Sequence, residues 1–528
     1  MSQQQRMILA LVLSFIFFIG YDFLMPKPQK VSVEQNHTSS ISTTAQSTAA
    51  PIANTSTAAP QQQSHTPQVA PPVVGKQSTT IATVSGKDFK LTIDELGRIS
   101  RYDVLIERFK EEGSYPNLIS DQSDLKPLEI RFKDPKLNSE AFSKAYSTDA
   151  SDVRLDGSSK TVTLTQKLST TEVTKKITFN PDGTYNITVS LSAPYDYFIS
   201  PGTRPDVAAD MYTFKGTFVQ KADGTTDTIE DGDGEGNEVF MGASILASSD
   251  KYYTTALYSF EDRFNIFMSK DAEDNPLGFI KGAKNLTVNG YIGPKEYDKL
   301  NAIDPQMTNI IEYGFFTFLA KPVFLFLKYI HSILGNWGWS IVAITLIIRL
   351  ILYPLTYKGM VSMNRLKELS PKIKEIQKQY KGEPQKMNAK MMALYKKHNA
   401  NPMGGCLPMI MQIPVFFAIY RVLLNSIELK HAEWIGWYHD LSVMDPYYVL
   451  PVLMGASMFW QQRITPTNFT DPMQEKIMKF LPLIFTFFFV TFPAGLTLYW
   501  FTNNLFSVAQ QYYVNSIFAK EKARKEAA

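Results

Sequence analysis

The sequence predicts an α-helical polytopic membrane protein with six transmembrane helices, an inserted all-β sandwich domain and a helical hairpin. Long apolar stretches at the N-terminus and after residue 312 indicate the helices. Short alternating runs separated by turn residues fill residues 81–312 and indicate the β domain. Basic and acidic residues are unevenly distributed, although the formal charge of the whole chain is only +3. Residues 26–320 hold about 29 Lys and Arg against about 38 Asp and Glu. The basic excess therefore lies beside the apolar stretches.

Residues 1–25 contain an apolar stretch from Met7 to Met25 that is broken only by Ser14 and Asp22. This length suits a membrane-spanning helix. The following FLMPKP offers no small-residue cleavage site, so we expect an uncleaved anchor rather than a removed signal peptide. Residues 26–80 are rich in Ser, Thr, Ala, Gln and Pro, which bury too little apolar area to fold, and we expect a flexible tether.

Residues 81–312 read as strands joined by turns. TVTLTQKL, VTKKITF and TYNITVSL alternate apolar and polar residues, and Asn180-Pro181-Asp182-Gly183 between the last two is a hairpin turn signal. FKLTIDELGRISRYDVL repeats the pattern, and the whole predicts an antiparallel sandwich. The DGDGEG run at 231–236 lacks the register of a calcium-binding loop, which favours a solvated turn over a metal site.

Five further apolar segments follow an amphipathic one. Residues 313–336 are interrupted by two lysines, a proline and a histidine, so a helix lying in the membrane interface fits better than a span. The predicted spans are 337–357, 407–427, 447–462, 480–493 and 494–514. The last two could instead be one helix, and the break at Phe492-Pro493-Ala494-Gly495 decides between five and six spans in total.

Loop charges favour six spans and give the orientation. Residues 360–405 contain ten Lys and Arg and three Glu, whereas 428–445 contain one Lys and four acidic residues. By the positive-inside rule the hairpin at 358–406 is cytoplasmic and the loop at 428–446 is outside. Six spans also place the N-terminus, the loop at 463–479 and the basic tail at 515–528 in the cytoplasm, whereas five would export that tail.

The β domain then lies on the outer side, and we expect a Gram-negative inner membrane with a periplasmic domain. The single cysteine, Cys406, rules out an intramolecular disulfide, and the six histidines lack zinc-ligand spacing. The segments 447–461 and 480–492 would be only about 22 and 20 Å long as helices, against a hydrocarbon thickness near 30 Å. A locally thinned bilayer follows from these lengths.

Arg349 stands in the apolar run ITLIIRLILYP, where a permanent cation costs roughly 2.5 to 3.5 kcal/mol to insert. Lys358 marks the cytoplasmic end of that span about 13 Å away, which is farther than an arginine side chain reaches. Asp22 is the one acidic residue in the predicted spans, so no carboxylate is expected near Arg349. The polar uncharged residues of the spans include Thr345, Gln412, Asn503, Asn504, Gln510 and Gln511. They favour a hydrated groove around the cation over a purely structural arginine.

The cytoplasmic segment predicts two helices. Ser370-Pro371 is a helix start signal, and Lys381-Gly382-Glu383-Pro384 ends one helix and begins the next. Apolar positions recur at helical spacing at Met363, Leu366, Leu369, Ile373, Ile376 and Tyr380, and then at Met387, Met391 and Leu394 or Tyr395. The basic face carries Lys372, Lys374, Lys378 and Lys381. It is either a solvated face or a docking surface for ribosomal RNA, anionic lipid or a targeting factor.

The sequence favours a protein that is not an enzyme and has no cofactor. No paired-carboxylate or nucleophile motif occurs in residues 81–312, which argues against an envelope enzyme. A small-solute or ion transporter with a periplasmic sensing domain is the alternative. It would need opposed charges at a central site and inverted repeats, and neither is evident in the sequence.

Several long motifs resemble the YidC/Oxa/Alb family of membrane protein insertases, in its proteobacterial form with a large periplasmic domain. They are NWGWSIVAITLIIRLILYPLT, SMNRLKELSPKIKEI, MMALYKKHNANPMGGCLPMIMQIPVFFAIY, DPYYVLPVLMGASMF, TDPMQEKIMKFLPLIFTFFF and FPAGLTLYWFTNN, in this order over residues 310–515. The resemblance implies insertion of nascent membrane proteins and help with their folding, alone or with the Sec translocon. It also implies contact with the ribosome, a targeting factor or receptor and membrane lipids, as a monomer or within a larger translocon assembly.

The resemblance further implies a five-helix core with a hydrophilic groove that is open to the cytoplasm and to lipid. Arg349, Thr345 and Gln412 match its groove positions. The positions where a substrate helix slides into lipid match Phe416, Met454, Phe488, Tyr499 and Trp500. Trp500 departs from the tyrosine common in the family, which removes a hydroxyl but keeps an amphipathic ring.

Overall fold

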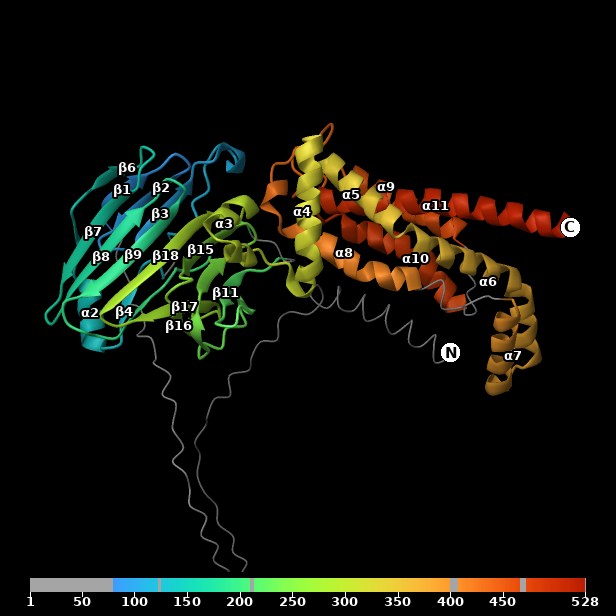
Figure 1. Cartoon of the computed structure of the whole chain (residues 1–528), viewed down its shortest axis with the longest axis horizontal. Helices are drawn as coiled ribbons and strands as arrows, with labels where there is room; N and C mark the ends of the chain where they lie inside the picture. Colours follow the sequence, from blue (N-terminus) through green and yellow to red (C-terminus); the bar gives the residue numbers. More distant parts are fainter. Residues whose placement is uncertain (1–78, 122–124, 209–212, 399–406, 466–471, 528) are drawn as a thin grey trace, which may run out of the picture. The chain divides into compact units, whose positions relative to one another are not determined.

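The computed structural model describes residues 79–121, 125–208, 213–398, 407–465 and 472–527. The predicted anchor at 1–25 and nearly all of the tether at 26–80 lie outside the described residues. The chain divides into two compact units, of which the second, Thr66–Asn468 with Lys476–Ala528, holds the β domain and almost all of the described helical residues. Figure 1 shows the strands and helices of this second unit.

The β domain is built of strands between residues 80 and 294. They are β1 (Thr80–Ser85), β2 (Phe89–Asp94), β3 (Ile99–Val104), β4 (Ile130–Phe132), β5 (Ser147–Thr148), β6 (Asp152–Arg154), β7 (Lys160–Lys167), β8 (Glu172–Phe179), β9 (Thr184–Leu191), β10 (Tyr197–Ile199), β11 (Gly216–Gln220), β12 (Thr226–Glu230), β13 (Val239–Ala243), β14 (Ile245–Ser249), β15 (Tyr253–Tyr258), β16 (Phe264–Lys270), β17 (Pro276–Gly282) and β18 (Asn285–Pro294), with α2 (Pro135–Ser143) after β4.

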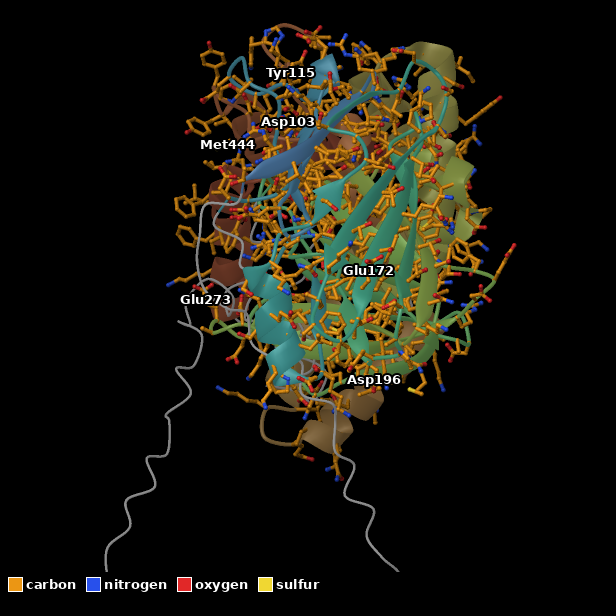
Figure 2. The ribbon with its side chains drawn as sticks, turned by 90° about the vertical axis from the view of Figure 1, so that its left-hand side faces the viewer. Asp103, Tyr115, Glu172, Asp196, Glu273 and Met444 are labelled. Carbon is orange, nitrogen blue, oxygen red and sulfur yellow. The ribbon has the colours of Figure 1, made fainter. Side chains whose placement is uncertain are left out.

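Three sheets form a layered domain, which Figure 2 shows with its side chains. The largest sheet has the order β12-β11-β14-β15-β18-β9-β8-β7-β5, the second β13-β16-β17-β10-β4 and the third β3-β2-β1-β6. Strand pairing is antiparallel except between β1 and β6. One core cluster takes Leu91, Ile187 and Ile266 from the three different sheets, and each such buried side chain contributes roughly 1.5 to 3 kcal/mol. The predicted sandwich is confirmed.

The predicted hairpins form where the turn signals lie. β8 and β9 pair from Phe179↔Tyr185 outward, and Gly183 has a φ of 88°, a conformation that glycine adopts without strain. β2 and β3 pair in the same way around Gly97, whose φ is 65°. The turn at Pro181 and Gly183 therefore sets which residues of β8 and β9 pair with each other.

The helices beyond the strands are α3 (Tyr297–Ile303), α4 (Thr317–Leu334), α5 (Trp337–Ile351), α6 (Tyr353–Gln379), α7 (Pro384–Lys397), α8 (Leu407–Asn425), α9 (Val449–Ile464), α10 (Pro472–Phe489) and α11 (Ala494–Ala527). α11 packs against α5, α6, α8 and α9, and α4 packs against α5 and α8. α11 continues through the predicted basic tail without interruption.

Length and composition identify one described helix that could cross a membrane, Gly314–Leu334, or two if the bent pair α5 and α6 is counted as a span. Met411–Asn425 and Lys479–Phe489 are apolar but shorter. The segment predicted to lie in the interface is thus also long enough to span. The number of spans therefore stays a prediction.

The predicted span 337–357 is not one straight helix. α5 ends at Ile351, and α6 leaves it at an angle of 65°. Pro354 in the first turn of α6 has no N–H to continue the ladder of hydrogen bonds, which explains the bend. Arg349 lies in the last turn of α5, directly before this bend.

The predicted helix start at Ser370-Pro371 is wrong. Both residues lie inside α6, which runs unbroken to Gln379. Leu366, Leu369 and Ile373 form one buried stripe on both sides of the proline. Burial of this stripe outweighs the roughly 3 kcal/mol that an interior proline costs.

α6 and α7 form a helical hairpin. α7 begins at Pro384, as the Lys381-Gly382-Glu383-Pro384 signal indicates, and Gly382 has a φ of 102°. Met391, Leu394 and Tyr395 of α7 pack against the buried stripe of α6. The predicted apolar faces of the two helices therefore meet.

The last two apolar segments form two helices with a break between them. α10 ends at Phe489 and α11 begins at Ala494. The first amides of α11 find acceptors outside the helix, because Ala494 N–H donates to the Val443 carbonyl at 2.7 Å and Gly495 N–H to the Leu441 carbonyl at 2.9 Å. The loop before α9 thus stabilises the turn between α10 and α11.

Gly290 leaves space for a neighbouring ring, and its replacement by alanine should destabilise the β domain. Gly290 of β18 pairs with Tyr185 of β9, and a Cβ at this position would lie 2.0 Å from Tyr185 Cζ. We expect Gly290→Ala to lower the free energy of unfolding by about 1–3 kcal/mol, because the buried ring must move. Thr287→Ala on the exposed face of the same strand is the control and should cost less than about 1 kcal/mol. Urea unfolding of the full chain in detergent, followed by proteolysis, measures both.

Lys175 makes the stability of the β domain depend on pH. Its ammonium is fully buried, donates to the Gly97 and Leu128 carbonyls at 2.8 Å and lies 4.7 Å from the centre of the Tyr146 ring. Burial lowers the pKa of Lys175 from 10.5 to about 7. Between about pH 7 and 10.5 the unfolded chain therefore keeps a proton on Lys175 that the folded chain has released. The free energy of unfolding consequently decreases as the pH falls from 10.5 toward about 7.

We expect the free energy of unfolding to rise more steeply in the wild-type chain than in Lys175→Met, by roughly 2 kcal/mol between about pH 7.5 and 9.5. Lys176→Met, on the exposed side of the same strand, should keep the wild-type slope. Equal slopes for wild type and Lys175→Met would contradict the assignment. Urea unfolding at a series of pH values measures the slopes.

Candidate functional site

The candidate site is the contact between Arg349 and α11. Arg349 Nε donates to Asn503 Oδ1 at 2.7 Å, and one terminal guanidinium nitrogen donates to the Asn503 backbone carbonyl at 3.3 Å. No Asp or Glu of the described residues pairs with Arg349. The cation is therefore held by a neutral residue, as the lack of carboxylates in the predicted spans suggests.

Gln412 reaches the same acceptor from a third helix. Its Nε2 donates to Asn503 Oδ1 at 3.3 Å, so side chains from α5, α8 and α11 meet at one oxygen. The structure thus brings two of the three predicted groove residues together. Asn503 was one of several polar candidates in the sequence, and its spacing of three residues from Trp500 and four from Ser507 is the signal that places it on the inner face of α11.

Thr345, the third predicted groove residue, makes its hydrogen bond within its own helix. It is buried one turn before Arg349, and its hydroxyl donates to the Ile341 carbonyl of its own helix at 2.6 Å. This hydrogen bond satisfies the hydroxyl locally, as is common for threonine in apolar helices. Thr345 therefore lies beside the site, and the structure does not link it to Arg349 or Gln412.

Polar contacts continue from Asn503 toward the end of α11 that lies beside the hairpin. Gln510 Nε2 donates to Thr356 Oγ1 at 2.5 Å, and Asn364 Nδ2 donates to Asn515 Oδ1 at 2.9 Å. Gln511 Nε2 also donates to Asn515 Oδ1, at 2.8 Å. Amides and hydroxyls thus line the α6–α11 contact, whereas Asn504 turns toward Ser457 of α9 at 3.4 Å.

An aromatic cluster lies next to the Arg349 contact. Trp500 is its centre, with ring centroids 4.7 Å from Phe416, 5.0 Å from Phe489 and 5.9 Å from Phe485. Tyr499 stacks on Phe416 at 6.5 Å, and Met454 of α9 is buried in the same apolar core. Four of the five predicted slide residues therefore belong to one cluster of helices α8 to α11.

Phe488 is the exception. It is half-buried in α10, and within the described part of the chain its ring makes no aromatic contact. Phe485 and Phe489, which the family resemblance did not single out, face Trp500 instead. They lie four residues apart, so the helical period that puts them on one face puts Phe488 off it.

The predicted docking lysines point to solvent. Lys372, Lys374, Lys378 and Lys381 are exposed, and none forms an ion pair with a described carboxylate. The end of α11 contacts the same hairpin, because Lys522 Nζ lies 3.0 Å from a carboxylate oxygen of Glu368 in α6. The hairpin and the tail therefore share one end of the helical part.

The loop after α8 contacts the β domain. Lys430 is buried, pairs with Glu111 and lies 5.4 Å from the centre of the Tyr253 ring. Glu428 accepts a hydrogen bond from the backbone N–H of Tyr297 at 3.0 Å, and burial raises its pKa to about 7. Among the described residues, no group of three His, Cys, Asp or Glu could hold a metal ion.

The fold and this site indicate a membrane protein that joins a β-sandwich domain to a helical region with a polar contact between its apolar helices. Residues 83–326 match the family model described as YidC periplasmic domain, and residues 329–522 match the model described as 60Kd inner membrane protein. The chain belongs to the YidC family of membrane protein insertases.

Curated relatives cover the full length. The membrane protein insertase YidC of Campylobacter jejuni is 51% identical over 525 residues, which is 99% of this chain and 98% of that protein. That of Wolinella succinogenes is 48% identical over 526 residues, with 99% and 97% covered. A crystal structure of an active YidC insertase is 20% identical and aligns over 85% of this chain and 96% of that chain, with a TM-score of 0.37.

Trp500 should be replaceable by another aromatic residue but not by alanine. Trp500→Ala removes the ring that joins α8, α10 and α11, and we expect it to lower the free energy of unfolding by about 3 kcal/mol. Trp500→Tyr keeps a ring of similar shape and should cost less than about 1.5 kcal/mol. Trp460→Ala, at an exposed tryptophan of α9, is the control. Thermal unfolding in detergent measures the three variants, and equal effects at positions 460 and 500 would contradict the cluster's role.

Proposed function

We propose that this chain inserts nascent membrane proteins into the bacterial inner membrane and assists their folding. The observation that carries the proposal is the Arg349–Asn503 contact in a member of an insertase family, because it leaves a permanent cation between apolar helices with no counter-charge from the described residues. A small-solute or ion transporter would be expected to balance a central charge with an opposite one. No described carboxylate does so here.

The six-span topology of the proposal agrees with contacts at both ends of the helices. The loop at 428–446 touches the β domain through Glu428 and Lys430, as expected if both are periplasmic. The end of α11 touches the α6–α7 hairpin through Asn515 and Lys522, as expected if both are cytoplasmic. A five-span chain would separate the tail from the hairpin.

We further propose that α4 lies at the periplasmic membrane surface. Its buried residues Ala320, Phe324, Leu327 and Ile330 recur at spacings of three and four and form one face. Lys321 Nζ donates to Thr308 Oγ1 at 2.9 Å, and Lys328 pairs with Asp298. Both lysines thus reach residues that lie outside the predicted spans, whereas exposed Phe318 and Ile333 suit contact with lipid.

In the proposed mechanism a hydrated groove around Arg349 lowers the barrier for the polar part of a substrate. A polar segment in hydrocarbon costs several kcal/mol for each unsatisfied group. Arg349, Gln412 and the amides of α11 offer hydrogen bonds partway across the bilayer, and the cation attracts acidic residues of a translocated tail. We also propose that the bilayer is thinned around α9, whose 16 residues span only about 24 Å, which shortens the remaining path.

Release of the substrate follows from its apolar segment. We propose that a nascent helix passes along the aromatic cluster of Phe416, Tyr499 and Trp500, with Met454 and Phe488 beside it. Burial of its side chains in lipid then drives it sideways out of the protein. The rings favour this role because they pack against varied apolar side chains while tolerating polar neighbours.

The partners follow from the same arrangement. The exposed lysines at 372, 374, 378 and 381 suit an anionic partner such as ribosomal RNA, a targeting factor or its receptor, or lipid head groups. We also propose that the chain works alone or with the Sec translocon. No cofactor enters the proposed mechanism, because each step is binding or partition.

Arg349 should matter most for substrates with acidic translocated tails. In cells depleted of their own insertase, we expect Arg349→Ala to lower insertion of a two-span substrate with an acidic tail roughly fivefold, equivalent to about 1 kcal/mol of lost attraction. A neutral-tailed version should change less than about twofold, because it gains little from the charge. Protease accessibility of the tail measures insertion.

Arg421→Ala is the matched control, since Arg421 is a second arginine in a predicted span but lies near its outer end. It should leave the preference for acidic tails unchanged. A photocrosslinker at Phe416 should capture stalled nascent chains in the wild type and in both variants. If wild type and Arg349→Ala insert the acidic-tailed and neutral-tailed substrates in the same ratio, the arginine has no electrostatic role.

A further inference from the structure

We infer that Asn503 is a positioning residue that fixes the Arg349 guanidinium without neutralising it, and so sets the preference of the site for acidic segments. This inference rests on the proposed insertase function. It concerns the residue that holds the cation, whereas the sequence and the family resemblance point to the cation itself.

The first step is the geometry at Asn503 Oδ1. This oxygen accepts from Arg349 Nε at 2.7 Å and from Gln412 Nε2 at 3.3 Å. The backbone carbonyl of Asn503 accepts from a terminal nitrogen of Arg349 at 3.3 Å and from Ser507 Oγ at 2.8 Å. Two acceptors on one residue therefore hold the edge of the guanidinium that carries Nε and Nη2, and fix its plane.

The second step is the number of donors that stay available. A guanidinium has five N–H donors, and the two bonds to Asn503 use donors on Nε and on one terminal nitrogen. The other terminal nitrogen, Nη1, makes no hydrogen bond to a described residue, and Arg349 is only partly buried. It can therefore meet an incoming carboxylate.

The third step is charge. A carboxylate at position 503 would fix the arginine equally well. However, it would form an ion pair with Arg349 and cancel the positive charge that attracts an acidic tail. An amide oxygen carries only a partial charge, so the Arg349–Asn503 pair keeps a net charge of one. Among uncharged residues, asparagine joins a strong acceptor to a short side chain whose position follows the helix closely.

The experiment compares three substitutions whose order depends on the role of Asn503. Asn503→Asp keeps the shape and the acceptor but adds a negative charge, Asn503→Leu keeps the shape but removes the acceptor, and Asn503→Gln keeps a neutral amide but changes the shape. Each full-length variant is expressed in insertase-depleted cells with the acidic-tailed and neutral-tailed two-span substrates. The readout is the ratio of acidic to neutral insertion.

We expect Asn503→Asp and Asn503→Leu to lower this ratio about fivefold, to the level of Arg349→Ala, which corresponds to about 1 kcal/mol. Asn503→Gln should stay within about twofold of the wild-type ratio. A role in packing alone predicts the reverse order, because Asp and Leu are close in shape to Asn and Gln is not. If Asn503→Asp fails to accumulate, the order of Asn503→Leu and Asn503→Gln still distinguishes the two roles.

Two results overturn the inference while leaving the insertase function intact. In the first, Asn503→Leu or Asn503→Asp keeps the wild-type ratio of acidic to neutral insertion while Arg349→Ala lowers it. In the second, this ratio falls in Asn503→Gln but in neither of the other two Asn503 variants. A ratio that does not respond to Arg349→Ala overturns it as well, together with the electrostatic mechanism. The proposed function itself fails if the folded wild-type chain inserts neither substrate.

Discussion

The cost of burying a permanent cation among apolar helices constrains the rest of the helical part. Arg349 cannot lose its charge, and it stands in the last turn of α5, directly before the bend into α6. It therefore needs hydrogen-bond acceptors at its own depth, and α11 supplies them through Asn503. α11 can do so because α10 ends at Phe489 and the chain turns back, a turn that the loop carbonyls at Leu441 and Val443 stabilise.

The bend after Arg349 serves the same arrangement. Pro354 removes one backbone donor in the first turn of α6, and α6 departs from α5 by 65°. Thr356 of α6 then meets Gln510 of α11, and Asn364 meets Asn515. Polar side chains that would each be costly in an apolar environment thus satisfy one another in a row that begins at Arg349. The α6–α11 contact is thus polar, whereas the contacts of Trp500 with α8 and α10 are apolar and aromatic.

Sequence patterns predicted best where the physical cause is local. The hairpin around Gly183 and the α6–α7 hairpin follow from turn residues and from periodic apolar positions, and both form as expected. The start signal at Ser370-Pro371 failed because packing of Leu366, Leu369 and Ile373 across the proline outweighs its local cost. The groove role implied for Thr345 is not supported by a contact, since its hydroxyl bonds to its own helix. At Ser370-Pro371, packing between different turns and helices thus overruled a reasonable local pattern.

The sequence by itself determined the class of protein, the sandwich domain, the presence of a cation with no carboxylate at its depth and the order of the apolar segments. These depend on composition and periodicity, which act along the chain. Only the tertiary structure decided which of the polar residues of α11 holds Arg349, that Phe485 and Phe489 rather than Phe488 face Trp500, and that Gln412 shares the same acceptor. Those choices depend on the rotation of each helix about its axis and on its offset against its neighbours. Packing of three helices sets both quantities, and no single segment of the sequence contains them.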